Sequence, residues 1–417
     1  MPHILVIGTL DTKLVEFRYL VDQLLSSPVR PKTPIRVTLI DCGRRPTKDE
    51  RITISQTDLL ERYGGENGNE IGNLPRGDLV KHMIGCVVRC VQDLVGQGDV
   101  HGIISAGGSC GTSLAATVMR DAVPIGMPKL IVSTVASGDT GPLVGETDIT
   151  MMYSVVDIAG SNRLLQTILA NAAGAMVGMA SSYQDFIARD QPLTRSRIGI
   201  TMFGVTTPGV EMVKERLETQ HRAEVYVFHA TGHGGKAMER MIREGRLDAV
   251  IDLTTTEICD HLMGGTMGAG PTRLEAALEA GIPTIISLGA TDMVNFGPRS
   301  TVPAAYQDRN LLEHNPTVTL MRTTPEECVQ VANFIVDKVK RFSKSPTTVQ
   351  LWIPRGGVSM IATPGGPFAD TRADDCMFEA LRKGLCDTAI KVVEDTRDIN
   401  DPSLATEMAD ALMRLSV

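Results

Sequence analysis

Short apolar runs alternate with longer amphipathic stretches along the whole chain. The first pair is HILVIG (3–8), which predicts a buried strand ending in glycine, and DTKLVEFRYLVDQLL (11–25), whose apolar residues recur at helical spacing. Asp11 stands where a helix N-cap is expected. Because this rhythm repeats toward the C-terminus, the sequence predicts an α/β fold with mostly parallel, doubly wound sheets.

The first half of the chain carries four predicted strands. They cover residues 3–8, 35–41, 101–108 and 129–139, and further helices are predicted at 78–98, 112–122 and 157–181. Residues 43–77 are polar and glycine-rich without a strong period, which predicts a long loop.

A break in the rhythm divides the chain. QDFIARDQPLTRSR (184–197) is polar and contains Pro192, and 417 residues exceed what one compact core usually organises. We predict an N-terminal Rossmann-like subdomain over 1–183, a linker over 184–197 and a C-terminal Rossmann-like subdomain over 198–417. The second series has predicted strands at 197–204, 224–230, 247–256, 283–289, 317–321 and 349–353, and helices near 374–384 and 402–415.

Composition narrows the class of protein. Hydrophobic residues make up 42% and charged residues 22%, as in folded globular proteins. A net charge of -8 and 4% aromatic residues argue against nucleic-acid binding. MPHILVIGTLDTK lacks the features of a signal peptide, and we find no apolar run long enough for a bilayer. Eight scattered cysteines without a CxxC pair predict free thiols. We therefore expect a cytoplasmic protein that binds neither nucleic acid nor membrane.

Glycine- and hydroxyl-rich segments follow the predicted strands. In open α/β sheets ligands bind beyond the carboxyl ends of the strands. Glycine admits a ligand close to the backbone, Ser and Thr donate hydrogen bonds, and helix N-termini attract phosphate. The segments with this character are GTLDTK (8–13), GGSCGT (107–112), ASGDTG (136–141), FGVTTPG (203–209), HATGHGG (229–235), DLTTTE (252–257) and GATDMVNFG (289–297).

These segments predict a site for a phosphorylated ligand. GTLDTK is not a complete phosphate loop, and neither half has one, so we predict a site shared between the subdomains in an interdomain cleft. Lys13 would neutralise charge, and Asp11 or Asp139 would hold Mg²⁺. The predicted nucleotide-binding residues are Thr9, Asp11, Thr12, Lys13, Gly107, Gly108, Ser109, Gly111, Thr112, Ser137, Gly138, Asp139, Gly204, Thr206, Thr207, Gly232, Gly234, Gly235, Thr254, Thr255 and Thr256.

Each of these segments, taken alone, also fits a purely structural role. GGSCGT also suits a tight turn with a helix cap, and TTTE (254–257) suits a cap of the next helix. Asp11 is equally suited to be an N-cap, and Lys13 a solvated surface charge. The recurrence of the same chemistry at seven strand ends is what favours a ligand site.

Two histidines are candidates for proton transfer. His229 and His233 lie four residues apart across glycines, with no third strong zinc ligand beside them. We expect hydrogen bonding or acid–base chemistry, with Glu257 or Asp292 as partner, and not a zinc site.

The order of motifs resembles a known family. GTLDTK, GGSCGT, STVASGD, MFGVTTPGV, FHATGHGGKAMER, DLTTTEICDHLMGG, GATDMVNFGP and PGGPFAD follow one another, over about residues 3–395, as in the ATP-binding, replication-inhibiting N-terminal domain family of the tomato mosaic virus resistance protein. The sequence departs from the family pattern at Thr272, where an acidic residue is more frequent. The resemblance implies two Rossmann-like subdomains, ATP binding and a homodimer. It also implies a TIM-barrel protein as a partner, encoded separately.

Three functional hypotheses remain open. The first is an ATP-binding protein, with Mg²⁺ as an accompanying ion. The second is an enzyme of small-molecule metabolism that acts on a phosphorylated or carboxylated metabolite. The third is a regulatory or scaffold subunit that binds nucleotide without turnover.

Overall fold

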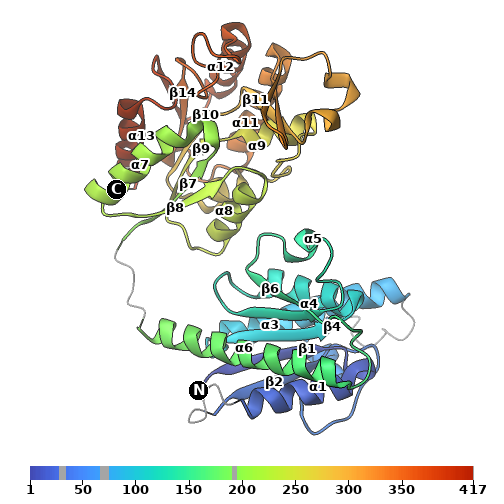
Figure 1. Cartoon of the computed structure of the whole chain (residues 1–417). Helices are drawn as coiled ribbons and strands as arrows, with labels where there is room; N and C mark the ends of the chain where they lie inside the picture. The colour runs from blue at the N-terminus through green and yellow to red at the C-terminus, as the bar shows by residue number, and fades with distance from the viewer. Residues whose placement is uncertain (28–33, 66–74, 190–194, 417) are drawn as a thin grey trace. The chain divides into compact units, whose positions relative to one another are not determined.

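The chain folds into two compact units, each built on a parallel six-stranded sheet. The computed structural model describes residues 1–27, 34–65, 75–189 and 195–416, and it divides into Met1–Pro192 (unit 1) and Leu193–Val417 (unit 2). In each unit helices cover both faces of the sheet (Figure 1). The predicted class, α/β with two Rossmann-like doubly wound sheets, is confirmed; the cleft between the units stays a prediction.

Unit 1 has the strand order β3-β2-β1-β4-β5-β6, with every neighbouring pair parallel. From β1 the chain adds β2 and β3 on one side, then crosses to add β4, β5 and β6 on the other. This is the order of dinucleotide-binding folds, and its switch point lies between β1 and β4. Its elements are β1 (His3–Gly8), α1 (Leu10–Leu25), β2 (Arg36–Asp41), β3 (Ile52–Ile54), α2 (Gln56–Tyr63), α3 (Arg76–Gly96), β4 (Gly102–Gly107), α4 (Ser109–Ala122), β5 (Lys129–Ser133), α5 (Gly141–Val144), β6 (Ile149–Tyr153) and α6 (Arg163–Arg189).

Alternating residues of β1 define the two faces of this sheet. Ile4 and Val6 belong to the core under α1 and α6, whereas Leu5 and Ile7 belong to the core under α2, α3 and α4. Every residue of β1 is buried, as expected for a central parallel strand covered on both faces.

Helix α6 is long and apolar enough, by length and composition alone, to cross a membrane, a feature that the sequence reading did not identify. Leu165, Leu169, Met176 and Val177 of this helix are buried in the core of unit 1. Its small, apolar composition therefore has a role in packing against the sheet.

Unit 2 has the strand order β15-β14-β10-β9-β7-β8, also parallel throughout. Helices α7 and α13 cover one face, and α9, α11 and α12 pack on the other, beside α8 and α10. The direction of strand addition reverses between β7 and β9, which is the switch point of this sheet. Its elements are β7 (Arg197–Met202), α7 (Thr207–Gln220), β8 (Glu224–His229), α8 (His233–Arg243), β9 (Ala249–Thr254), α9 (Thr256–Met263), α10 (Glu275–Ala280), β10 (Thr284–Gly289), β11 (Met293–Phe296), β12 (Leu311–Asn315), β13 (Val318–Arg322), α11 (Pro325–Phe342), β14 (Val349–Pro354), α12 (Thr371–Leu385), β15 (Lys391–Asp395) and α13 (Pro402–Leu415), with short 3-10 helices at Gly204–Thr206, Arg299–Thr301, Ala304–Tyr306 and Pro346–Thr348.

A small antiparallel sheet corrects one strand assignment. The strand predicted at 317–321 is β13, and it pairs with β11 and β12 in a separate three-stranded sheet, not with the parallel sheet. Thr319 and Leu320 alternate across this hairpin-like insertion as they would in either sheet, so periodicity alone does not separate the two placements.

Two local predictions also differ from the structure. The predicted loop 43–77 contains β3 and α2, and α2 starts with a capping box in which Ser55 Oγ accepts from the Asp58 amide. The linker predicted from residue 184 begins inside α6, which continues to Arg189; residues 190–194 lie outside the described residues.

Candidate functional site

A cavity of about 280 Å³ lies at the switch point of unit 1. It is bounded by the segments that follow β1, β2 and β4, and by the first turns of α3. Its lining residues are Thr9, Asp11, Thr12, Lys13, Cys42, Arg44, Leu79, Val80, Met83, Gly108, Ser109, Cys110, Gly111 and Leu114. The structure thus brings two predicted segments, GTLDTK and GGSCGT, to one cavity.

The N-terminus of α4 forms the polar end of this cavity. Gly108 is the N-cap and supplies no side-chain cap to the first N–H groups of the helix. A Cβ placed on Gly108 would lie 3.8 Å from its nearest neighbour, Thr134 Oγ1, so the cavity is open at this point. Ser109 and Gly111 line the same end. These backbone groups and the helix dipole together favour an anion.

Two other residues of the predicted GGSCGT segment, Gly107 and Thr112, have structural roles beside the cavity. A Cβ on Gly107 would lie 3.0 Å from the Gly111 Cα, so Gly107 is required for the close passage of strand and helix. Thr112 is fully buried, and its Oγ1 donates to the Gly107 carbonyl oxygen and bonds Ser133 Oγ at 2.7 Å.

Positive charge reaches the cavity from Lys13 and Arg44. Lys13 has a non-helical backbone inside α1, and its Nζ donates to the carbonyl oxygen of Ile158. The Arg44 amide donates to Asp11 Oδ2 at 3.1 Å, which ties the loop after β2 to the start of α1. Arg44 was missed by the sequence reading because it lies in the segment predicted to be a featureless loop.

A buried carboxylate organises this corner. Asp41, at the end of β2, accepts hydrogen bonds from the amides of Leu10, Gly43 and Thr47. Burial raises the pKa of Asp41, and the three amide donors oppose that shift. Asp41 thus fixes the turn from β1 into α1.

The predicted residues after β5 lie elsewhere. Ser137, Gly138 and Asp139 are exposed and are not lining residues of the cavity; Asp139 Oδ1 accepts from the Gly141 amide at 3.0 Å. Within residues 1–27, 34–65, 75–189 and 195–416, no group of three or more His, Cys, Asp or Glu is placed to hold a metal. Magnesium at Asp11 or Asp139 stays a prediction.

In unit 2 the threonines at the switch point are used inside the protein. Thr206 Oγ1 and Thr254 Oγ1 bond each other at 2.8 Å, and Thr255 Oγ1 donates to the Ser287 carbonyl oxygen. Thr256 is equally buried, and its Oγ1 accepts from Asn295 Nδ2. Thr207 Oγ1 donates to the Phe203 carbonyl oxygen, while Gly204 is exposed. The buried hydroxyls are therefore not presented to a ligand.

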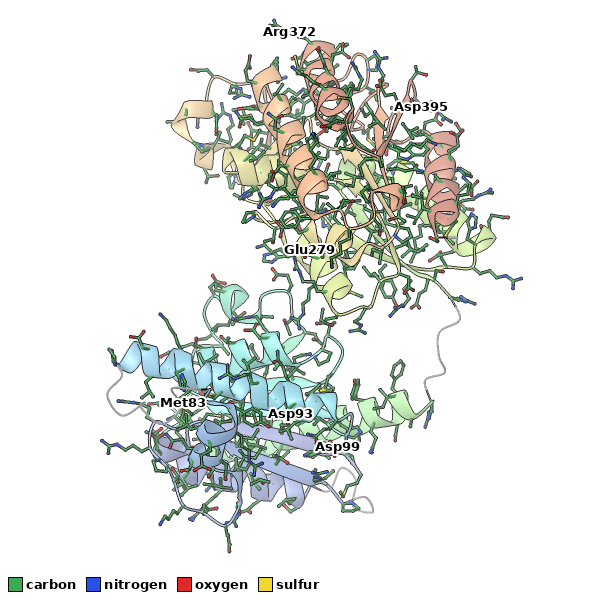
Figure 2. The ribbon with its side chains drawn as sticks, turned by 180° about the vertical axis from the view of Figure 1, so that it is seen from behind. Met83, Asp93, Asp99, Glu279, Arg372 and Asp395 are labelled. Atoms are coloured by element: carbon green, nitrogen blue, oxygen red, sulfur yellow. The ribbon has the colours of Figure 1, made fainter. Side chains whose placement is uncertain are left out.

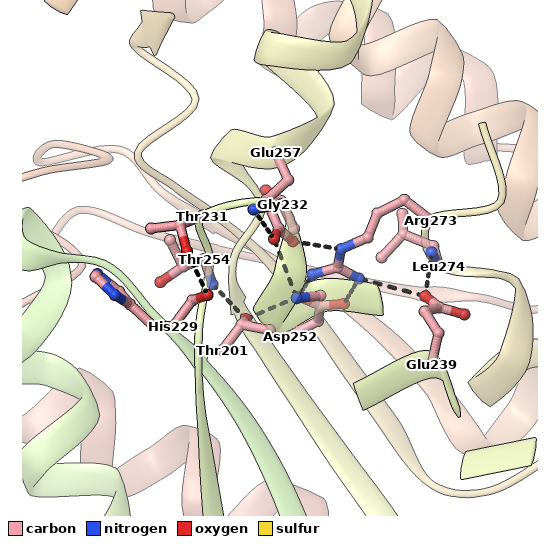
Figure 3. Close-up of polar contacts among 12 residues, drawn as sticks. Thr201, His229, Thr231, Gly232, Glu239, Asp252, Thr254, Glu257, Arg273 and Leu274 are labelled. Atoms are coloured by element: carbon pink, nitrogen blue, oxygen red, sulfur yellow. Dashed lines mark hydrogen bonds and ion pairs between the residues drawn. The ribbon is translucent and has the colours of Figure 1, made fainter. Parts of the chain in front are cut away.

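A buried ion cluster fills the space beside these threonines (Figure 3). Arg273 is about 1% exposed, and its guanidinium pairs with Asp252, with Glu257 at 2.8 Å and with Glu239 at 3.5 Å. Thr201 Oγ1 donates to Asp252 Oδ1 at 2.8 Å, which links the cluster to β7. The sequence reading missed Arg273, because no local pattern shows that it reaches three acids from 16 to 34 residues away.

Two predicted glycines pack against this cluster, and a third packs against the backbone of His229. The amides of Gly232 and Gly235 donate to Glu257 Oε1 at 2.7 and 3.0 Å. A Cβ on Gly235 would lie 2.0 Å from Glu257 Oε2, and one on Gly234 would lie 1.9 Å from the His229 carbonyl oxygen. These glycines are required by packing, and Glu257 is held by Arg273 and the backbone rather than free for proton transfer.

The candidate histidines stand at the surface. His229 ends β8 and stacks on Phe203 with ring centroids 5.7 Å apart. His233 is the first residue of α8 and is exposed. An acid–base role for either stays a prediction.

The remaining candidate, Asp292, is fully buried after β10. Its Oδ2 accepts from Ser359 Oγ at 2.8 Å, and its Oδ1 has no hydrogen-bond partner among the residues that the structure describes. Burial raises the pKa of Asp292 to about 7, and burial likewise raises that of Asp260 to about 7. Both carboxyls retain protons in the folded state at pH values where they ionise in the unfolded chain.

We predict that unit 2 loses stability as the pH rises from about 4 to about 7. In this window the folded state binds more protons than the unfolded state, so the free energy of unfolding falls by up to about 1.4 kcal/mol per pH unit for each such group. Urea unfolding at pH 5 and pH 8, followed through Trp352, measures the difference. Asp292→Asn should reduce it, whereas Asp308→Asn at an exposed site should not. An unchanged difference in Asp292→Asn would contradict the assignment.

Comparison with known proteins gives matches along the whole chain. The models described as "Uncharacterised protein family (UPF0261) N-terminal domain" and "C-terminal domain" match residues 2–185 and 195–416. A "UPF0261 protein" of Clostridium tetani is 43% identical over 99% of this chain and 98% of its own length. The "ToMV susceptible protein tm-1(GCR26)" of Solanum lycopersicum is 37% identical over all of this chain, which spans 56% of the tomato protein's length.

Solved structures with a similar architecture include a "putative UDP-N-acetylglucosamine 2-epimerase from Listeria monocytogenes". It is 11% identical, with a TM-score of 0.22, over 68% of this chain and 78% of that one.

Proposed function

The chain belongs to the UPF0261 family, and from this membership and the geometry of unit 1 we propose that it binds a phosphorylated small molecule, ATP foremost, at the switch point of that unit. One observation carries the proposal. Two phosphate-type segments, separated by about ninety residues, meet at a single cavity between the ends of β1 and β4. Ligands of open α/β sheets bind at this position.

The two ends of the cavity suit the two ends of a nucleotide. Phosphate oxygens would accept from the backbone of Gly108 to Gly111 at the start of α4, with Lys13 and Arg44 as compensating charges. Leu79, Met83 and Leu114 supply an apolar wall for a base or sugar. A volume of about 280 Å³ suits a mononucleotide better than a dinucleotide.

Asp11 is the residue that would hold Mg²⁺, because it is the carboxylate among the lining residues. With one carboxylate, the ion would take its other ligands from phosphate oxygens and water. Lys13 Nζ would exchange its bond to the Ile158 carbonyl for one to a phosphate oxygen.

We place the nucleotide in unit 1 and not in a site shared between the units. The hydroxyls of Thr206, Thr254 and Thr255 bond within unit 2, so presenting them to a ligand would leave buried groups unpaired. Such a loss costs about 1–3 kcal/mol for each group.

Gly108→Val should weaken ATP binding at least about tenfold, or about 1.4 kcal/mol. The side chain fits the fold, since the nearest atom to the new Cβ is 3.8 Å away, but it occupies the phosphate end of the cavity. Calorimetric titration of the full chain with ATP measures the effect. Thermal unfolding establishes that the variant is folded.

Gly204→Val is the matched control, because Gly204 is a strand-end glycine of unit 2 with nothing within 4 Å of a new Cβ. It should leave the ATP affinity unchanged. Equal affinity for wild type and Gly108→Val would disprove the cradle. A loss of affinity in both variants would indicate a site shared between the units.

A further inference from the structure

A second cavity, of about 340 Å³, lies in unit 2 at the carboxyl ends of β14 and β15. It is separate from the switch point of that sheet, which lies between β7 and β9. Polar lining residues come from three segments: Arg355 after β14, Thr396 after β15, and Asp370, Thr371, Asp374 and Asp375 at the start of α12. In Figure 2 the labels Arg372 and Asp395 mark the chain neighbours of Thr371 and Thr396.

The wall of this cavity is rigid backbone. A Cβ on Gly356 would lie 2.6 Å from the Thr396 carbonyl oxygen, so the chain leaving β14 packs directly on the chain leaving β15. Asp370 Oδ1 accepts from the Ala373 amide and fixes the first turn of α12. The backbone that carries these side chains is therefore held in place around the cavity.

Asp374 presents a carboxylate oxygen to the cavity. The residue is 8% exposed, and its Oδ1 accepts from Arg322, whose guanidinium also donates to the Phe368 carbonyl oxygen. Asp374 Oδ2 has no hydrogen-bond partner among the residues that the structure describes, and Asp374 lines the cavity. This oxygen can accept a hydrogen bond from a ligand.

Arg355 brings the opposite charge. Its side chain is 47% exposed, and its ion pair with Asp375 is long, because Nη2 lies 4.0 Å from Asp375 Oδ1, beyond hydrogen-bond distance. The guanidinium can therefore bind a planar carboxylate with two parallel hydrogen bonds. Phe378 and Ala362 add apolar surface between the charged groups.

We propose that this cavity binds a small zwitterionic amino-carboxylate, the chemistry of an α-amino acid. The ligand's ammonium group donates to Asp374 Oδ2, with Asp370 and Asp375 nearby, and its carboxylate accepts from Arg355. A bare cation would use the carboxylates but not Arg355, and an anion would meet three carboxylates. A zwitterion satisfies both signs of charge.

The test is a calorimetric screen of the full chain against the standard L-amino acids, each offered alone. At least one should bind with a Kd below about 1 mM. Arg355→Gln should weaken that binding at least about tenfold, whereas Arg372→Gln, at an exposed residue of α12 that does not line the cavity, should not change it. The decarboxylated amine of the same side chain should bind weakly, and equally to wild type and Arg355→Gln.

Three results would overturn the proposal: no amino acid binds below about 1 mM, Arg355→Gln leaves the Kd unchanged, or Mg²⁺ and the amine bind as tightly as the amino acid. The last result would indicate a cation site. ATP binding in unit 1 should be the same in Arg355→Gln as in wild type, so this proposal and the nucleotide proposal fail or succeed separately.

Discussion

Arg273→Met is expected to destabilise unit 2 by about 3–5 kcal/mol. The guanidinium is the cation that Asp252, Glu257 and Glu239 share, and all of these side chains are nearly or fully buried. Without it, three carboxyls would face one another in a medium that does not stabilise charge. Replacing all four groups by apolar residues would cost less than removing the arginine alone.

Urea unfolding followed by tryptophan fluorescence isolates this effect. Trp352 is the single tryptophan of the chain, it lies in β14, and it is 5% exposed, so its emission reports unit 2. Arg273→Lys should lie between wild type and Arg273→Met, because it keeps a charge but loses the forked hydrogen bonds.

Arg372→Met is the control for the loss of an arginine in unit 2. Arg372 is exposed on α12, so this change should shift the free energy of unfolding by no more than about 0.5 kcal/mol. A shift of less than about 1 kcal/mol in Arg273→Met would show that the cluster contributes little to stability.

The strand ends of the two units have the same residue types but different surroundings. Glycine and threonine after a strand predict a polar switch point in both units, and in unit 1 that prediction finds a cavity at Gly108 and Lys13. In unit 2 the threonine hydroxyls bond to one another and to the backbone, and the glycine amides donate to Glu257, which pairs with Arg273. Local composition does not encode which distant side chain fills a strand end, so only the folded chain separates the two cases.

The helices and strands likewise divide into those that the sequence predicts and those that it does not. Buried central strands were predictable because uninterrupted apolar runs such as 3–8 have few other placements. The edge strands β3 (Ile52–Ile54), β6 (Ile149–Tyr153) and β15 (Lys391–Asp395) were missed, since three residues or half-exposed segments such as KVVED give little pattern. The helix after Ser55 had a readable signal, the S-x-x-D capping box, which outweighs the polar composition around it.

Gly234→Ala should destabilise unit 2 by about 1–3 kcal/mol. The new Cβ would lie 1.9 Å from the carbonyl oxygen of His229 and 2.6 Å from its carbonyl carbon. That carbonyl is fixed, because it accepts from the Thr231 amide at 2.8 Å and β8 pairs with β7 at this residue. The clash is with backbone, so it cannot be relieved by turning a side chain.

Whether Gly234→Ala lowers or raises the free energy of unfolding distinguishes a backbone clash from the effect of helix propensity. Gly234 is the second residue of α8, and alanine in place of glycine normally stabilises a helix by about 0.5–1 kcal/mol. Gly204→Ala, with open space around the new Cβ, provides the control and should stay within about 0.5 kcal/mol of wild type. Urea unfolding through Trp352 measures both.

A stabilised Gly234→Ala would mean that the HATGHGG turn is open, as a phosphate loop would be. A destabilised variant whose folded form binds ATP as tightly as wild type would mean that these glycines are required by packing, and that the nucleotide is bound by the other unit.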